Sequence, residues 1–164
     1  MSFEIPAEVA ARVSRLALEY GATPFMVLHA ALAVVLARLS GTGDIAVATP
    51  IAGRGDRVLD PLIGMFVNTL VLRTPIDTAR SFAELIAEVR DTDLAAFAHS
   101  IVPFEAVVDA VDPVRTEAFA PLAQVMLSFD PAASAAGDGV AIEGLTLTPV
   151  EPADAPTDLD LTLR

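Results

Sequence analysis

Few side chains in this sequence could act as acids, bases or metal ligands. The 164 residues include two histidines, His29 and His99, and no cysteine. Neither histidine has a carboxylate or a second histidine four residues on, because Ala33 and Pro103 occupy those positions. The sequence also lacks the Gly-x-Ser-x-Gly elbow of a serine nucleophile and a glycine loop of the kind that binds phosphate. We therefore expect no metal site, no directly bound cofactor and no catalytic residue among these side chains.

Both histidines have interpretations that do not require catalysis. His29 lies inside the most apolar stretch, residues 25–39, so we interpret it as a hydrogen-bonded core or boundary histidine. A catalytic base would need a pocket and a partner. His99 lies near the end of an expected helix, where the helix dipole favours a local capping role. The Arg-Gly-Asp tripeptide at residues 54–56 matches a cell-adhesion string, but three residues are weak evidence and we interpret it as a solvated loop.

Composition and charge narrow the class of protein. Hydrophobic residues make up 54% of the chain and charged ones 20%, which excludes a disordered chain and fits one domain. The net charge of −12 argues against nucleic acid or an anionic membrane as partners. Residues 25–39 are too few for a bilayer span of about 20 residues, and the N-terminus shows no targeting segment. Without cysteines there is no disulfide, so we expect a soluble, cytoplasmic protein.

The hydrophobic pattern predicts interleaved helices and strands. Helices are expected over residues 7–20, 24–39, 82–98 and about 103–111, and strands over 45–51, 63–73, 125–129, 145–150 and 159–163. Thr23-Pro24 and the pair Ser81 and Glu84 have the spacing of helix N-caps. This order indicates an α/β fold, a layered mixed β-sheet flanked by helices. The last strand runs to the C-terminus with no closing element, so we expect a chain that is cut rather than finished.

Residues 63–73 resemble a signature of condensation domains from nonribosomal peptide synthetases. They read Ile-Gly-Met-Phe-Val-Asn-Thr-Leu-Val-Leu-Arg and match every fixed position of Ile-Gly-x-Phe-Val-Asn-Thr-x-x-x-Arg. Residues 21–28 and 44–54 are also similar to family segments, in the expected order. Residues 99–105, His-Ser-Ile-Val-Pro-Phe-Glu, resemble His-Gln-Asp-x-Pro-Phe-Glu with the central Gln-Asp replaced. Residues 121–126 resemble the next segment, whereas the usual Arg-Asp-x-Ser-Arg is poorly kept in 115–120. The resemblance covers about residues 3–163.

The resemblance implies a domain of two lobes, each similar to chloramphenicol acetyltransferase, with the active site in a tunnel between them. Residues 1–164 resemble only the C-terminal lobe, so we expect an incomplete domain, trimmed at its C-terminus as well. The catalytic His-His-x-x-x-Asp-Gly motif belongs to the first lobe and is absent here. In the intact family, an acceptor amine attacks a donor thioester, and both are carried on phosphopantetheine arms. This lobe is therefore expected to be part of an acyltransferase, to supply an acceptor-side wall and to be inactive alone.

The matched motif positions are the candidate site residues. They are expected to be structural or to line the tunnel wall: Gly64, Phe66, Asn68, Thr69, Arg73, His99, Pro103, Phe104 and Glu105. Gly64 allows a tight strand entry or the close approach of another backbone. Asn68 and Arg73 are polar positions in an apolar strand, which favours internal hydrogen bonds or ion pairs over substrate contact. Glu105 suits the first turn of its helix.

The resemblance also implies partners. These are the N-terminal lobe, peptidyl carrier proteins and an adjacent adenylation domain, with phosphopantetheine arriving as part of the substrates rather than as a cofactor. Two alternatives stay open. One is a condensation-like docking module without catalysis that recruits carrier proteins or tailoring enzymes, and the other is a related two-lobed acyltransferase or epimerisation domain. Because the surface that faces the first lobe would be exposed, we expect a homo-oligomer or a marginal monomer.

Overall fold

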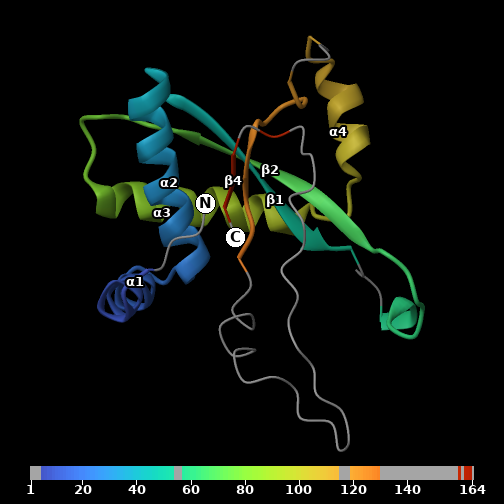
Figure 1. Cartoon of the computed structure of the whole chain (residues 1–164), viewed down its shortest axis with the longest axis horizontal. Coiled ribbons are helices and arrows are strands. Elements are labelled where there is room, and N and C mark those ends of the chain that lie inside the picture. Colours follow the sequence, from blue (N-terminus) through green and yellow to red (C-terminus); the bar gives the residue numbers. More distant parts are fainter. Residues whose placement is uncertain (1–4, 54–56, 115–118, 130–158, 160, 164) are drawn as a thin grey trace, which may run out of the picture.

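The computed structural model describes residues 5–53, 57–114, 119–129, 159 and 161–163. Its elements run α1 (Ala7–Glu19), α2 (Pro24–Ser40), β1 (Asp44–Ala52), the 3-10 turn η1 (Arg57–Leu59), β2 (Val67–Pro75), α3 (Phe82–Ala98), α4 (Phe104–Val111), β3 (Val125–Leu127) and β4 (Leu161–Leu163). In this part of the chain the four strands form one sheet, in the order β2-β1-β3-β4 (Figure 1). Strands β1 and β2 are antiparallel, whereas the other neighbours are parallel. The expected mixed sheet flanked by helices is confirmed.

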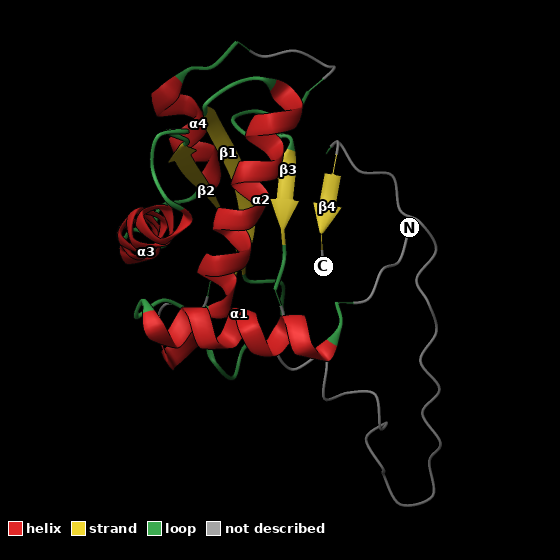
Figure 2. Ribbon diagram, turned by 90° about the vertical axis from the view of Figure 1, so that its left-hand side faces the viewer, coloured by secondary structure: helices red, strands yellow, loops and turns green. Residues whose placement is uncertain are grey.

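The helices form a layer that covers the sheet. Helix α2 packs against β1 and α3 packs against β2, and α1 runs across the lower end of α2 in Figure 2. Helix α4 lies across the β1–β2 hairpin from α2 in Figure 1 and contacts β2. The hairpin therefore separates the α2–α3 layer from α4, and it carries the Phe-Val-Asn-Thr segment at the start of β2.

Helix α2 belongs to both hydrophobic clusters of the core, which explains its apolar composition. One cluster lies between α1, α2 and α3 and includes Met26, Ala30 and Ile86. The other lies between α2 and the sheet and includes Ala33 and Val47. A helix buried on two sides needs apolar residues on both. The end of α2 leaves this core, and Leu39 there is 80% exposed.

The helices begin and end at the residues that local sequence signals predict. The hydroxyl of Thr23 accepts a hydrogen bond from the Met26 N–H at the start of α2, and Gly41 ends that helix in the left-handed region. Ser81 and Glu84 form the predicted capping box of α3. Helix α4 ends at Asp112, as predicted.

Three expectations about the elements need correction or lie beyond the described residues. The second strand begins at Val67 rather than at residue 63, because Ile63 lies in the loop with its side chain fully in solvent. Val111, expected on the inner face of α4, is more than half exposed. The strand expected at 145–150 and the tripeptide at 54–56 fall outside the described residues.

Three buried polar side chains join α2, α3 and β2. His29 Nδ1 lies 3.1 Å from both carboxylate oxygens of Asp93, and His29 Nε2 lies 3.3 Å from Thr74 Oγ1. This order of hydroxyl, imidazole and carboxylate is that of a hydrolase triad. All three side chains are at most 1% exposed, so they are out of reach of a substrate. His29 is thus a hydrogen-bonded core histidine, as predicted.

Removal of the Asp93 carboxylate tests this network. We expect Asp93→Ala to lower the free energy of unfolding by about 3–5 kcal/mol, because it leaves a buried imidazole without its partner. Urea denaturation measures the change. Asp91→Ala is the matched control, because Asp91 lies on the same helix, is exposed and pairs only with its neighbour Arg90. Equal losses in the two variants would contradict the structural role given to the network.

Candidate functional site

The side chain of Asn68 connects the two motif segments. Its Nδ2 donates to the carbonyl oxygens of Ser100, at 2.9 Å, and Val102, at 2.8 Å. Its Oδ1 accepts from the backbone N–H of Phe104, at 3.1 Å, and of Thr69, at 2.9 Å. A primary amide has two N–H donors and two acceptor lone pairs, so Asn68 is saturated. The motif on β2 is thereby fixed to the segment that enters α4, and Asn68 has no capacity left for a substrate.

Two glycines allow close contacts at Phe66, where the hairpin strands end. The Gly53 N–H donates to the Phe66 carbonyl oxygen, and a Cβ at Gly53 would lie 3.1 Å from that oxygen. A Cβ at Gly64 would lie 3.3 Å from an edge carbon of the Phe66 ring. The tight approach predicted for Gly64 is thus to a side chain rather than to another backbone. Gly53 was missed by the sequence analysis, although its position directly after an apolar run is typical of a strand end.

A shallow hollow of about 320 Å³ lies where these segments meet. It is lined by Ala52, Gly53, Phe66, Val67, Asn68, Ser100, Ile101, Pro103 and Glu105. Four of the nine candidate site residues therefore share one concave surface, and Phe104 and Thr69 touch it through Asn68. Among the described residues that line it, polar and apolar surface are present in about equal measure, and Glu105 is the one ionisable side chain.

Arg73 lies away from the hollow. Its Nε and Nη2 each donate to one carboxylate oxygen of Asp44 at 2.8 Å. This bidentate bond lowers the pKa of Asp44 and raises that of Arg73. The predicted ion pair exists, but both side chains are more than half exposed, so it is not internal. The pair borders a wider hollow of about 790 Å³ between α4, the hairpin and β3.

His99 also lies apart from the hollow. It is the C-cap residue of α3, and its backbone N–H donates to the Ala96 carbonyl oxygen at 3.1 Å. The side chain is exposed and does not line the hollow. Neither histidine of the chain is therefore positioned as a base at the surface formed by the two motifs. Among the residues described, no three His, Asp or Glu side chains are close enough to hold a metal ion.

Exposed apolar side chains lie on the two segments of the chain that contribute to the hollow, the loop that leads into β2 and the turn before α4. They are Val58, Leu62, Ile63, Met65, Val67, Ile101 and Val102, each at least 40% exposed, and we call this set the hairpin surface. Large exposed apolar surfaces on a protein mark sites of interaction. The hairpin surface includes part of both motif segments, so it is a candidate contact surface for another polypeptide.

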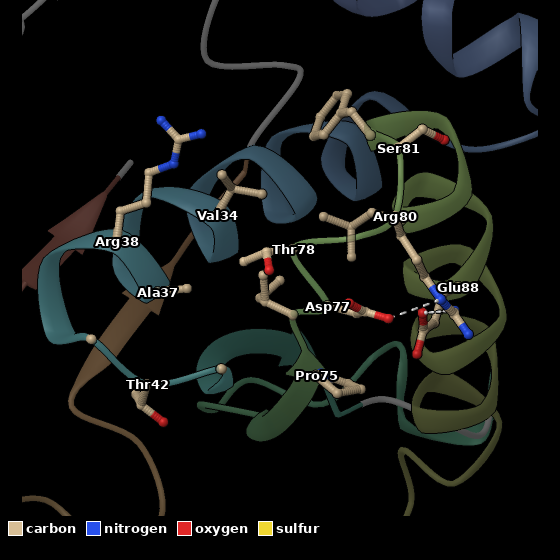
Figure 3. Close-up of a pocket in the computed structure, with 15 residues that line it drawn as sticks. Val34, Ala37, Arg38, Thr42, Pro75, Asp77, Thr78, Arg80, Ser81 and Glu88 are labelled. Atoms are coloured by element: carbon tan, nitrogen blue, oxygen red, sulfur yellow. Dashed lines mark hydrogen bonds and ion pairs between the residues drawn. The ribbon is translucent and has the colours of Figure 1, made fainter.

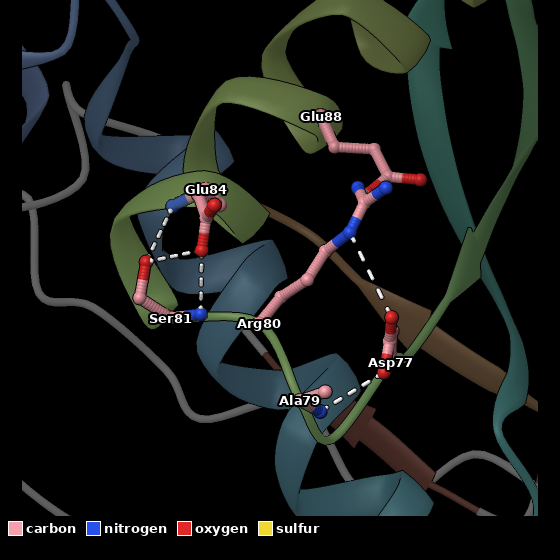
Figure 4. Close-up of polar contacts among 6 residues, drawn as sticks. All are labelled: Asp77, Ala79, Arg80, Ser81, Glu84 and Glu88. Carbon is pink, nitrogen blue, oxygen red and sulfur yellow. Dashed lines mark hydrogen bonds and ion pairs between the residues drawn. The ribbon is translucent and has the colours of Figure 1, made fainter.

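A groove of about 450 Å³ lies between the end of α2, the loop after β2 and the start of α3 (Figure 3). Its charged side chains hold that loop: Arg80 lies 2.7 Å from Glu88 and 3.8 Å from Asp77 (Figure 4). Nearby, Ser81 donates to Glu84 from its N–H and its hydroxyl, which lowers the pKa of Glu84. None of the candidate site residues lines this groove, and its polar contacts serve to begin α3.

Helix α2 is apolar and follows α1 after a short turn, so the two helices bear on whether the chain could enter a membrane. Within the described ranges, no single helix is long and apolar enough to cross a bilayer. Helices α1 and α2 reach the required length only together, and they are bent by 106° at the break between them.

Comparison with known proteins gives a family context for this geometry. The family model described as the condensation domain matches residues 1–163. Isonitrile lipopeptide synthase from Mycobacterium tuberculosis is 52% identical over 124 residues, which are 76% of this chain and 5% of that protein. The chain spans 2% to 5% of the length of the curated relatives that it matches.

Solved structures show the same fold. The four-domain nonribosomal peptide synthetase holo-AB3403, bound to AMP and glycine, gives a TM-score of 0.75 at 30% identity over 78% of this chain and 10% of that one. The X-domain in its complex with OxyB from teicoplanin biosynthesis gives a TM-score of 0.77 at 27% identity, and the match covers 95% of this chain and 33% of that one. The predicted chloramphenicol acetyltransferase-like lobe is confirmed.

Asn68→Asp tests the link between the two segments. The carboxylate can still accept the hydrogen bond from the Phe104 N–H, but it has no N–H to donate and it faces the carbonyl oxygens of Ser100 and Val102. We therefore expect the free energy of unfolding to fall by about 1–3 kcal/mol. The same carbonyls raise the pKa of the new carboxyl in the folded state. The deficit is therefore full above that raised pKa, shrinks as the pH falls from it toward about 4, the ordinary pKa of an aspartate, and changes no further below that value.

Urea denaturation at several pH values measures the free energy of unfolding of the variant. Thr69→Ser is the control, because Thr69 contacts the Asn68 side chain through its backbone N–H, which the substitution keeps. A deficit that does not change with pH would contradict the assigned contacts.

Proposed function

Because this chain belongs to the condensation domain family of nonribosomal peptide synthetases, we propose that it forms the second, acceptor-side lobe of such a domain. The family forms peptide bonds. The observation that supports the proposal is the Asn68 linkage, which builds one concave surface from two family motifs and leaves an apolar surface beside it. In this role the lobe is one wall of the tunnel.

The proposed chemistry is completed by groups on the other lobe. The acceptor amine attacks the carbonyl carbon of the donor thioester, an amide bond forms and the carbon–sulfur bond breaks. The amine proton passes to a histidine of His-His-x-x-x-Asp-Gly, which returns it to the sulfur, so the donor carrier protein leaves as its thiol. Here His29 is buried and His99 ends α3, so neither replaces that base. We therefore propose that the chain is inactive alone and contributes shape and binding surface.

The proposed role implies the partners of this chain. The first lobe would cover the hairpin surface, and peptidyl carrier proteins would deliver both substrates on phosphopantetheine arms. An adjacent adenylation domain would charge the acceptor, and the assembly would work in the cytoplasm. The four-domain synthetase holo-AB3403 supports a multidomain setting for domains of this kind.

One observation favours a second candidate function. The X-domain bound to OxyB is similar to this chain over 95% of its length. The alternative proposal is a condensation-like docking module without catalysis, which recruits carrier proteins or a tailoring enzyme. The two proposals differ in whether product forms when both lobes are present.

A two-part assay tests the main proposal. We expect no peptide product when this chain is mixed with aminoacyl- and peptidyl-loaded carrier proteins, because neither His29 nor His99 is positioned as a base at the surface formed by the two motifs. Addition of a condensation-domain first lobe with intact His-His-x-x-x-Asp-Gly, as a separate polypeptide, should give product by mass spectrometry. A first lobe with its second histidine replaced by alanine is the control. Product from this chain alone would refute the proposal, and association without product would favour the docking module.

The hairpin surface also predicts self-association of the isolated chain. We expect light scattering after size-exclusion chromatography to show a mass that rises with protein concentration, since an exposed apolar surface binds a second copy. The double variant Ile63→Lys and Met65→Lys should restore the monomer. Leu18→Lys is the control, because Leu18 is exposed on α1 and lies outside the hairpin surface. A monomer at all concentrations, or equal effects of both variants, would count against this use of the surface.

A further inference from the structure

The hollow beside Asn68 carries a single negative charge. Among the described residues of the lining, Glu105, in the first turn of α4, is the one that is ionisable, and no ion pair within the same part of the chain engages its carboxylate. Three of the described arginines, Arg73, Arg80 and Arg90, pair with other carboxylates. The charge of Glu105 is thus available to a ligand.

The remaining polar groups of the hollow favour a ligand that donates hydrogen bonds. The Asn68 amide is saturated by backbone partners, so it offers no N–H to an anion. The Ser100 carbonyl oxygen accepts one hydrogen bond from Asn68 and keeps a second lone pair. A carboxylate and a carbonyl in the same hollow suit a primary ammonium group, which has three N–H donors and no acceptor.

The walls and size of the hollow limit the rest of the ligand. Phe66, Val67, Ile101 and Pro103 supply apolar surface. A volume of about 320 Å³ is at the lower end for small-molecule sites, which begin at about 300 Å³. This space suits a group of the size of one amino acid rather than a large cofactor.

We propose that this hollow binds a primary ammonium group on a short apolar substituent, with Glu105 as its anionic contact. The inference rests on the proposed function, in which the acceptor is an aminoacyl group. Glu105 would hold the acceptor ammonium as it arrives, and the ammonium would give up one proton to water before attack. The base on the first lobe would then be free to take the second proton from the attacking amine. Contact with that lobe would exclude water from the hollow, and an ion pair is stronger where water is excluded.

Nuclear magnetic resonance of the isotopically labelled chain tests the inference. Leucinamide is the probe, at about pH 6.5, where its α-amino group is mostly protonated. The neutral control ligand is 4-methylpentanamide, which has the same carbon skeleton without the amine. We expect leucinamide to shift the backbone amide signals of Asn68, Ser100 and Glu105, and we expect the neutral amide to bind more weakly.

Two variants assign the contact. Glu105→Gln should weaken leucinamide binding about two- to five-fold, the range for an exposed ion pair. Glu8→Gln removes an exposed carboxylate from the first turn of α1 and should change nothing. The spectra also report whether each variant is folded. Equal binding of the two ligands, equal binding by Glu105→Gln, or no shift in the hollow would overturn the inference.

The outcomes separate this inference from the proposed function. If the first lobe associates and product forms but leucinamide does not bind in the hollow, the inference fails and the proposed function stands. If leucinamide binds through Glu105 and no first lobe associates, the hollow is an amine site in a protein with another role, and the proposed function fails.

Discussion

One side-chain amide determines how the motif-bearing segments of this chain lie relative to each other. Asn68 reaches from β2 to backbone groups 32 to 36 residues further along the chain. All of its hydrogen-bonding capacity is used, so a change at this position leaves half-buried and exposed backbone groups without this partner. The start of α4 and the placement of Glu105 depend on these bonds. The hollow is a consequence of the same contacts.

The helix layer and the motif surface have separate tasks. Helix α2 shares its apolar side chains between two core clusters, and His29, Asp93 and Thr74 connect the helices to β2 from inside. The side chains that most resemble a catalytic triad are thus the least accessible ones. The described residues of the hollow and the hairpin surface include exposed apolar side chains and one carboxylate, that of Glu105. This composition fits a lobe that provides a binding surface while the other lobe provides the base.

The sequence predicted the helices because their signals are local. Caps at Thr23 and Ser81 and a period of 3.6 residues need only neighbouring positions. The start of β2 was placed too early, because residues 63–66 are apolar and read like a strand although they lie in an exposed loop. The resemblance identifies the motif residues, but a sequence motif does not tell which of its side chains meet in space. His99 and Arg73 belong to the motifs and lie apart from the hollow.

The long-range contacts could not be predicted from the pattern. The partner of His29 lies 64 residues away on another helix, and the partner of Arg73 is set by the register of β1 against β2. Burial was predicted for Arg73 from its apolar strand, yet Arg73 is exposed because its neighbours Leu72 and Thr74 occupy the buried face of β2 and side chains alternate along a strand. Such contacts depend on how elements pack, which periodicity does not encode.

The central claim is that this chain is one lobe of a two-lobed enzyme and meets the other lobe through its hairpin surface. Amide hydrogen exchange, measured by mass spectrometry with and without a first lobe, tests this most directly. The claim predicts slower exchange in residues 57–67 and 99–103 when the first lobe is added, and little change in α1. Unchanged exchange in both segments, or protection confined to α1, would contradict it.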